Sequence, residues 1–213
     1  MGPTNRHQCL IYDGSPSRNL PILAQTIREK LADDYRCLYL DSPPMVAGMR
    51  SYLSAAGIDV ARELTLGSLL LSSDQSHLID GHFDVDKMIR ALEDAIQKAV
   101  GDGYRGLWAT GDMSWELGPD RNFDKLLEYE WRLEQLFFKQ PALSGICQYH
   151  RDAMPREAVR EGLVSHRRIY INQTLSRLNP YYVTADAPED RRPAVRPELD
   201  DVIIGLTEAP EPA

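Results

Sequence analysis

Residues 7–31 read HQCLIYDGSPSRNLPILAQTIREKL. The apolar run at residues 8–12 predicts a strand, the Gly, Ser, Pro and Asn residues at 13–19 predict a loop, and residues 17–32 predict a helix. One face of that helix carries apolar residues at spacings of three and four, namely Leu20, Leu23, Ile27 and Leu31. A strand, a glycine-containing loop and a helix in this order form the cradle for nucleotide phosphates in many α/β proteins.

The loop lacks most of what phosphate chemistry requires. A Walker A loop uses glycines to expose backbone amides, a lysine to neutralise phosphate and a hydroxyl to bind Mg²⁺. Here Gly14 is the only glycine of the loop, and no lysine precedes Lys30. Arg18 can neutralise an anion, Ser15 and Ser17 can donate to one, and the helix N-terminus adds free amides. We therefore keep binding of an anion or small polar ligand as a hypothesis and do not expect ordinary ATP hydrolysis. The simpler alternative is that Ser17 only caps the helix.

The rest of the chain alternates apolar strand-like runs with amphipathic helices. Further strands are expected at residues 36–40, 64–71, 104–110, 143–149 and 168–171. Helices are expected at residues 45–56, 85–100, 123–139 and 155–163, with a polar connector at 72–84. Because the strands are continuous apolar runs, they are typical of a parallel sheet that is covered on both faces. The predicted fold class is α/β, a three-layer αβα sandwich around a mostly parallel central sheet.

The composition is that of a soluble globular protein, with 43% hydrophobic and 26% charged residues. The net charge of −8 argues against a nucleic-acid-binding surface, so no direct nucleic-acid partner is expected. No apolar run approaches the ~20 residues that span a bilayer, and no signal-peptide pattern is present, so we expect a cytoplasmic protein without membrane association. Cys9, Cys37 and Cys147 lie in apolar runs and are expected to be buried free thiols.

We divide the chain into a folded domain at residues 1–184 and a tail at residues 185–213. From residue 185 the composition becomes Pro-rich and acidic, which is typical of a flexible segment. The apolar residues 202–204 interrupt this tail. They either dock as a strand on the domain edge, which is the simpler interpretation, or serve as a linear motif for a partner.

Two short motifs raise the question of a metal site, His7-x-Cys9 and Cys147-x2-His150. In a parallel sheet, His7 and Cys9 lie near the start of one strand, whereas Cys147 and His150 close another. Strands rise ~3.3 Å per residue, which separates the two ends of a five-residue strand by roughly 16 Å. A compact four-ligand zinc site is therefore not expected, no metal ligand is assigned, and the thiols are placed in the core.

Several polar residues follow directly after predicted strands. Ligands of open α/β folds bind in the crevice at the carboxyl ends of the strands, and aromatic side chains would supply its walls. The predicted ligand site comprises Tyr12, Asp13, Ser15, Ser17, Arg18, Asn19, Asp41, Asp112, Trp115, Glu116, Tyr149 and His150. In the competing interpretation the acids cap helices or turns and the aromatics belong to the core. No catalytic residue is assigned, because no Ser/His/Asp or Cys/His constellation can be assembled without free choice of partners.

A series of short motifs runs through most of the chain. They are His7-x-Cys9-x-x-Tyr12, Gly67-x-Leu69, Gly81-x-Phe83-Asp84-x-Asp86-x-Met88, Gly106-Leu107, Gly111-Asp112-Met113-x-Trp115, Glu128-Tyr129-Glu130, Cys147-Gln148-Tyr149, His166 and Asn179-Pro180-Tyr181-Tyr182. Their order and number resemble the MEDS domain, the methanogen/methylotroph, DcmR sensory domain. The resemblance covers residues 7–183.

The resemblance implies a divergent RecA/KaiC-like P-loop fold that has lost Walker A. Asp112 would then stand near the Mg²⁺-binding position of Walker B, where the family usually carries Glu. Such domains are thought to sense small molecules, such as hydrocarbon derivatives, and to signal to attached DNA-binding or kinase domains. We expect no attached domain here, so the output would pass through a separate protein partner, a regulator or kinase, or through a homo-oligomer.

The expected function is a non-catalytic sensory domain that binds a small-molecule ligand at the carboxyl ends of the strands. It would signal to a separate partner in transcriptional or signal-transduction control. A second hypothesis is a residual nucleotide-binding protein or weak NTPase of KaiC-like type, acting through Arg18, Asp41, Asp112 and Glu116. A third is an oligomeric scaffold. The sequence identifies no cofactor.

Overall fold

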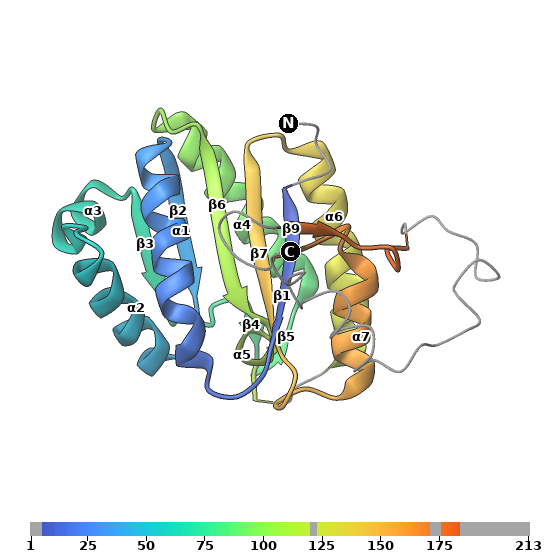
Figure 1. The fold of residues 1–213 in the computed structure, drawn as a ribbon. Coiled ribbons are helices and arrows are strands. Elements are labelled where there is room, and N and C mark those ends of the chain that lie inside the picture. The colour runs from blue at the N-terminus through green and yellow to red at the C-terminus, as the bar shows by residue number, and fades with distance from the viewer. Residues whose placement is uncertain (1–5, 120–122, 171–175, 184–213) are drawn as a thin grey trace, which may run out of the picture.

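A computed structural model describes residues 6–119, 123–170 and 176–183 of the chain (Figure 1). Its centre is a seven-stranded sheet with the order β3-β2-β6-β7-β1-β8-β9. The strands are β1 (His7–Tyr12), β2 (Tyr35–Leu40), β3 (Leu69–Ser72), β6 (Gly106–Asp112), β7 (Leu143–His150), β8 (Arg168–Tyr170) and β9 (Ser176–Leu178). Neighbouring strands are parallel except for β8 and β9, which are antiparallel. A separate hairpin is formed by β4 (Leu78–Ile79) and β5 (His82–Phe83).

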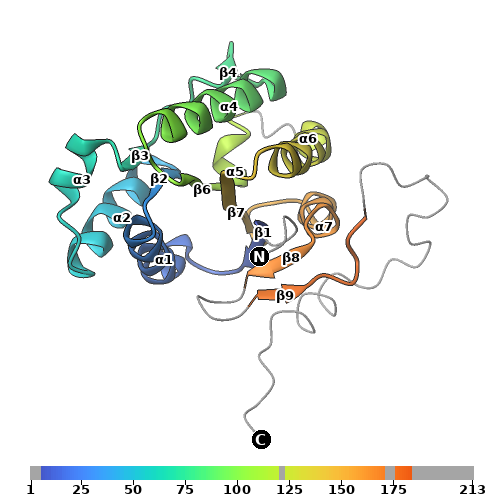
Figure 2. The same ribbon diagram turned by 90° about the horizontal axis from the view of Figure 1, so that it is seen from above.

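Helices cover both faces of this sheet (Figure 2). One face carries α1 (Leu20–Ala32), α2 (Pro43–Ala55) and α3 (Val60–Leu66), and the other carries α4 (Val85–Gly101), α6 (Leu126–Lys139) and α7 (Arg156–Ser165). Each face has its own hydrophobic core. Leu107 of β6 belongs to the core under α4 and α6, and the next residue, Trp108, belongs to the core under α1 and α2. The predicted class, an α/β sandwich with a mostly parallel central sheet, is confirmed.

The strand predicted at residues 64–71 is wrong at its start, because α3 occupies residues 60–66. The Asp59 side chain caps this helix by accepting from the Arg62 amide at 3.1 Å. Gly67 ends it with a φ of 72°, a conformation that glycine adopts without strain. Both are ordinary helix-boundary signals, and only Leu69–Ser72 pairs with β2.

The shortest helices and strands were not predicted from the sequence. The connector at residues 72–84 contains the β4–β5 hairpin, and α5 (Met113–Glu116) follows β6 directly. The helix predicted from residue 17 is a 3-10 turn, η2 (Pro16–Asn19), followed by α1, and η3 (Phe123–Lys125) likewise precedes α6. Elements of two to four residues are too short to show a hydrophobic period. The proposed tail at 185–213, with its apolar residues 202–204, lies outside the described residues.

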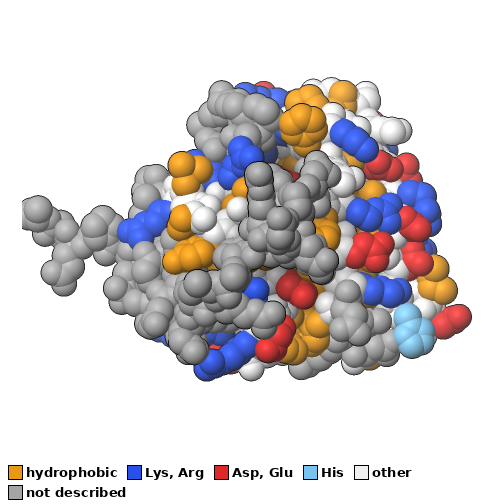
Figure 3. Space-filling model, turned by 90° about the vertical axis from the view of Figure 1, so that its right-hand side faces the viewer, with side chains coloured by type: hydrophobic (Ala, Val, Ile, Leu, Met, Phe, Trp, Pro, Cys, Tyr) orange, Lys and Arg blue, Asp and Glu red, His pale blue; other side chains and the backbone are white. Residues whose placement is uncertain are grey.

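Three expectations drawn from composition can be compared with the described residues. Cys9, Cys37 and Cys147 are free and buried, as predicted. Within residues 6–119, 123–170 and 176–183, no helix combines the length and the apolar character needed to cross a membrane. The third expectation is that the protein has no nucleic-acid-binding surface. Figure 3 shows acidic and basic side chains next to one another on the described part of one face. The absence of a nucleic-acid partner stays a prediction. The RecA/KaiC-like part of the fold prediction stays a prediction.

Candidate functional site

The carboxyl edge of the sheet brings together tyrosines and acids from β1, β2 and β6. Tyr12 ends β1, and its hydroxyl donates to Asp112 Oδ2 at 2.6 Å, across the intervening strand β7. Asp41 follows β2 and accepts from the Tyr39 hydroxyl at 2.8 Å. Burial raises the pKa of Asp41 to about 6, and the nearby charge of Asp112 adds to the shift. Tyr12, Asp41 and Asp112 therefore cluster as predicted. Their side chains form hydrogen bonds with other residues of the same chain.

Asp112 has a structural role at this edge. Its side chain caps α5 by accepting from the Trp115 amide at 3.1 Å, and it also accepts from the Ser114 hydroxyl. The interpretation of the strand-end acids as helix caps is thus correct for Asp112. Trp115 contributes its backbone at this point, and its carbonyl accepts from Gln75 Nε2 at 2.9 Å.

Replacing Asp112 with alanine is expected to lower the free energy of unfolding by about 1–2 kcal/mol, because the cap is lost and the Tyr12 hydroxyl loses its acceptor. Asp112→Asn keeps an acceptor oxygen and a favourable cap residue, so it should retain most of the stability. Urea denaturation of both variants measures the difference. An equal loss in the two variants would show that the charge, and not the cap, stabilises this edge.

Glu116, the last residue of α5, is 2% exposed and lies over the end of β6. A Cβ on Gly111 would overlap Glu116 Oε1, so glycine is needed there for the carboxyl to fit. Glu116 Oε2 makes no hydrogen bond within the part of the chain that the structure describes. Burial raises the pKa of Glu116 well above its ordinary value, and the charges of Glu130 and Asp112 add to the effect. The raised pKa favours the neutral acid form of this side chain.

Glu116 forms part of the wall of a cavity of about 30 Å³. The rest of the wall is mostly apolar and includes Met88 and Leu92 of α4 and Leu133 and Phe137 of α6. One water molecule needs a cavity volume of ~10–15 Å³, so this cavity has room for only a very small molecule. Apolar walls with one polar anchor are characteristic of small-molecule binding sites.

The loop after β1 is tied to the turn that follows β7. Asp13 pairs with Arg151 at 2.6 Å, and the Gly14 carbonyl accepts from His150 Nε2 at 2.8 Å. The Gly14 amide donates to Asp152 Oδ2 at 2.8 Å. A carboxylate of the chain itself therefore occupies the glycine amide that a bound phosphate would use, which weakens the anion-binding hypothesis.

The rest of this loop is folded on itself. The hydroxyls of Ser15 and Ser17 lie 2.8 Å apart, and the Arg18 guanidinium lies over Gly14. Because α1 begins at Leu20 with Asn19 as its N-cap residue, the interpretation of Ser17 as a helix cap is wrong. The predicted loop residues 13–19 thus stay together as a group, but none of them lines the cavity beside Glu116.

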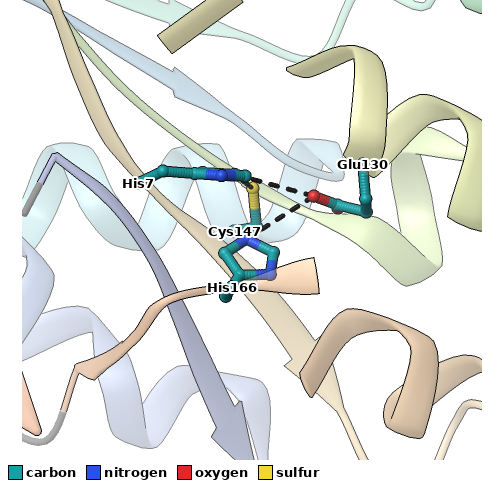
Figure 4. Close-up of side chains that lie close together, drawn as sticks. All are labelled: His7, Glu130, Cys147 and His166. Atoms are coloured by element: carbon teal, nitrogen blue, oxygen red, sulfur yellow. Dashed lines mark hydrogen bonds and ion pairs between the residues drawn. The ribbon is translucent and has the colours of Figure 1, made fainter. Parts of the chain in front are cut away.

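Tyr149 lies away from the predicted crevice. Its ring is fully buried on β7 and its hydroxyl donates to Glu130 of α6. Glu130 in turn faces His7, Cys147 and His166, whose ligand-type atoms together lie within 4.8 Å of one another (Figure 4). Burial raises the pKa of Glu130 to about 7. This group, the His7–Glu130–Cys147–His166 cluster, is the other concentration of functional side chains in the described chain.

Cys147 does not lie at the end of its strand, where the sequence-based prediction had placed it. β7 continues to His150, so Cys147 lies in mid-strand and pairs with Cys9. Its Sγ is 3.5 Å from His7 Nε2, whereas His150 does lie at the far end, opposite Tyr12. One signal for Glu130 was visible in the sequence, since it is a carboxylate on the otherwise apolar face of α6.

Comparison with known proteins supports this fold. The crystal structure of an uncharacterized protein from Pyrococcus horikoshii, in complex with an unknown peptide, superposes with a TM-score of 0.59 at 16% identity. The match covers 80% of this chain and 80% of that chain. At this identity the likeness concerns the fold alone. No curated protein matches the sequence.

The family comparison covers most of the chain. The family model described as MEthanogen/methylotroph, DcmR Sensory domain matches residues 6–167. That range contains β1 to α7, the Glu116 cavity and all four members of the His7–Glu130–Cys147–His166 cluster. The chain therefore belongs to the MEDS family of sensory domains.

Proposed function

We propose that this chain senses a small molecule of a few non-hydrogen atoms, bound in the cavity beside Glu116. The observation that carries the proposal is the buried Glu116 carboxyl, whose Oε2 makes no hydrogen bond among the described residues and which stands on a mostly apolar wall. A protonated carboxyl both donates and accepts. It therefore suits a ligand with one hydroxyl, carbonyl or amide group on a short apolar body.

The signal would leave the site through α5 and the β4–β5 hairpin. Glu116 is the last residue of α5, and its backbone carbonyl accepts from His77 Nε2 at 2.7 Å. A ligand that repositions Glu116 would move α5 and, with it, the hairpin that follows His77. Ile79 in this hairpin is 47% exposed and offers an apolar contact for a separate protein partner. The ligand can shift this equilibrium only if it binds the two states with different affinity.

The second hypothesis, nucleotide hydrolysis, has less support than small-molecule sensing, because the residues assigned to it are engaged elsewhere. Asp41 and Asp112 accept from tyrosines, and the Gly14 amide donates to Asp152. Arg18 belongs to the surface loop and does not line the Glu116 cavity. The weak-NTPase and scaffold hypotheses therefore stay without a specific supporting observation.

Ethanol, 1-propanol and acetamide are suitable probes. A ligand of about three or four non-hydrogen atoms binds no tighter than about 40 μM, because each atom contributes at most about 1.5 kcal/mol, or about 6 kcal/mol for four atoms. We expect saturable NMR shifts at cavity residues between about 1 and 100 mM probe. Ala109 lines the cavity, and Ala109→Val should fill it and abolish these shifts.

Ala47→Val is the matched control, because Ala47 is exposed on α2. It should bind the probes as the wild type does. Saturable shifts that persist in Ala109→Val would place the binding elsewhere. No saturable shift with any of the three probes in the wild type would overturn the proposal.

A further inference from the structure

Four side chains from separate parts of the fold converge between the sheet and α6 (Figure 4). His7 begins β1, Cys147 lies in β7, Glu130 lies on α6, and His166 directly follows α7. Their exposed fractions are 3%, 6%, 0% and 0%, respectively. Glu130 Oε2 lies 3.6 Å from His7 Nε2 and 3.5 Å from His166 Nε2, and Cys147 Sγ lies 3.5 Å from His7 Nε2.

These spacings fit a metal ion at the centre of the cluster. Tetrahedral zinc with bonds of about 2.0–2.3 Å holds neighbouring ligand atoms about 3.3–3.8 Å apart. Three of the six spacings, at 3.5–3.6 Å, lie within this range. All six are at most 4.8 Å, so the longer ones must close by up to about 1 Å when the metal binds. An ordinary salt bridge or hydrogen bond would instead draw two of the atoms together and leave the others apart.

The outer nitrogens of both imidazoles are already fixed. His7 Nδ1 lies 2.7 Å from Glu134 Oε2, and His166 Nδ1 lies 2.6 Å from the Gly162 carbonyl. Each of these acceptors favours a proton on Nδ1, which leaves the Nε2 lone pair directed into the cluster. Metal-binding histidines almost always donate their second nitrogen to a carboxylate or carbonyl in this way.

Two inward-facing atoms lack hydrogen-bond partners. Glu130 Oε2 and His166 Nε2 make no hydrogen bond within the described chain, although both residues are fully buried. Such atoms are costly, and a single cation would coordinate both. With Cys147 as thiolate and Glu130 as carboxylate, the ligand set carries two negative charges, which balance a divalent cation in a site that excludes water.

We propose that His7, Glu130, Cys147 and His166 form a four-coordinate site for a divalent transition metal, with Zn²⁺ as the first choice. On binding, the Cys147 thiol and the Glu130 carboxyl release their protons to solvent and bind the metal through Sγ and Oε2. The two neutral imidazoles bind through Nε2. Four protein ligands leave no open position, so the metal links β1, β7, α6 and the α7–β8 junction and has no catalytic role. This inference does not depend on the proposed ligand of the Glu116 cavity.

Metal binding can be tested on the full-length protein without any variant. Protein stripped with a chelator and titrated with Zn²⁺ should take up one equivalent per chain, measured by mass spectrometry of the metal content. Titration with Co²⁺ should give the visible bands of tetrahedral Co²⁺ and a near-ultraviolet thiolate-to-Co²⁺ charge-transfer band. The proposal is overturned if the protein binds neither Zn²⁺ nor Co²⁺ at one equivalent per chain. It is also overturned if Co²⁺ binds without the thiolate-to-Co²⁺ charge-transfer band.

Variants then identify the ligands. Cys147→Ala and His166→Gln should raise the Kd for Zn²⁺ by about 100-fold or more, and Glu134→Gln by about 10- to 100-fold, because Glu134 only orients His7. Cys37→Ala is the matched control, since Cys37 is also a buried free thiol but packs in the other core. It should bind Zn²⁺ as the wild type does. Unchanged affinity in a folded Cys147→Ala protein would rule out the assigned ligand set.

Discussion

Replacing Glu116 with glutamine is expected to make the protein more stable than the wild type at neutral and alkaline pH. Because its pKa is raised, Glu116 keeps its proton to a higher pH in the folded state than in the unfolded chain, where it ionises near pH ~4.3. Above that pH the folded state holds one more proton, so rising pH costs the wild type about 1.4 kcal/mol per unit until the folded-state pKa is reached. Glutamine does not titrate, so the variant lacks this loss.

Urea denaturation at intervals between about pH 5 and pH 8 measures the effect. The difference in unfolding free energy between Glu116→Gln and the wild type should grow with pH until the folded-state pKa of Glu116 is reached. Asp41, with its pKa of about 6, contributes the same pH dependence to both proteins. Glu157→Gln, an exposed position on α7, is the control and should parallel the wild type. A constant difference between Glu116→Gln and the wild type would mean that folded Glu116 is ionised throughout.

Gly162→Ala is expected to lower the free energy of unfolding by about 1–3 kcal/mol. A Cβ at this position on α7 would overlap three atoms of the Tyr149 ring. The ring cannot move aside easily, because it is fully buried and its hydroxyl is bound to Glu130. Helix α7 must therefore shift, and His166 shifts with it, because His166 Nδ1 is bound to the Gly162 carbonyl.

Thermal unfolding should show a fall in Tm of about 3–10 °C for Gly162→Ala. Gly101→Ala is the matched control, because a Cβ on this glycine at the end of α4 would meet nothing within 4 Å. That variant should be neutral or slightly stabilised, since alanine favours the helix. A similar loss of stability in both variants would point to backbone effects and not to contact with Tyr149.

The fold was predictable to the extent that hydrophobic pattern determines it. Strand β6 and helix α4 were expected within two residues of their observed bounds, because each buries enough apolar side chains to show a period. The pattern failed at α3, where Leu64 and Leu66 precede a true strand and extend its apolar run backwards. There the boundary signals were Asp59 and Gly67, which apolar content does not register.

The clusters depended on information that a single sequence does not carry. Strand order and register decide which residues meet, and the insertion of β7 between β1 and β6 brings Cys147 to His7. Without the register, Cys147 was placed at a strand end and therefore too far from His7. Glu116 was singled out as a strand-end acid, but the cavity beneath it depends on how α4 and α6 pack over the sheet. All four cluster residues do occur in the motifs by which the sequence resembles the MEDS domain.

The place of β1 in the sheet affects how the chain is made. Among the described strands β1 is synthesised first, yet its two neighbours, β7 and β8, are encoded near the end of the described domain. During synthesis β2, β3 and β6 can pair with one another, while β1 stays an unpaired apolar segment until β7 emerges. Contacts this distant in sequence form slowly, and truncated chains expose unpaired strand edges. A fragment that stops before β7 should therefore be a substrate for chaperones and proteases.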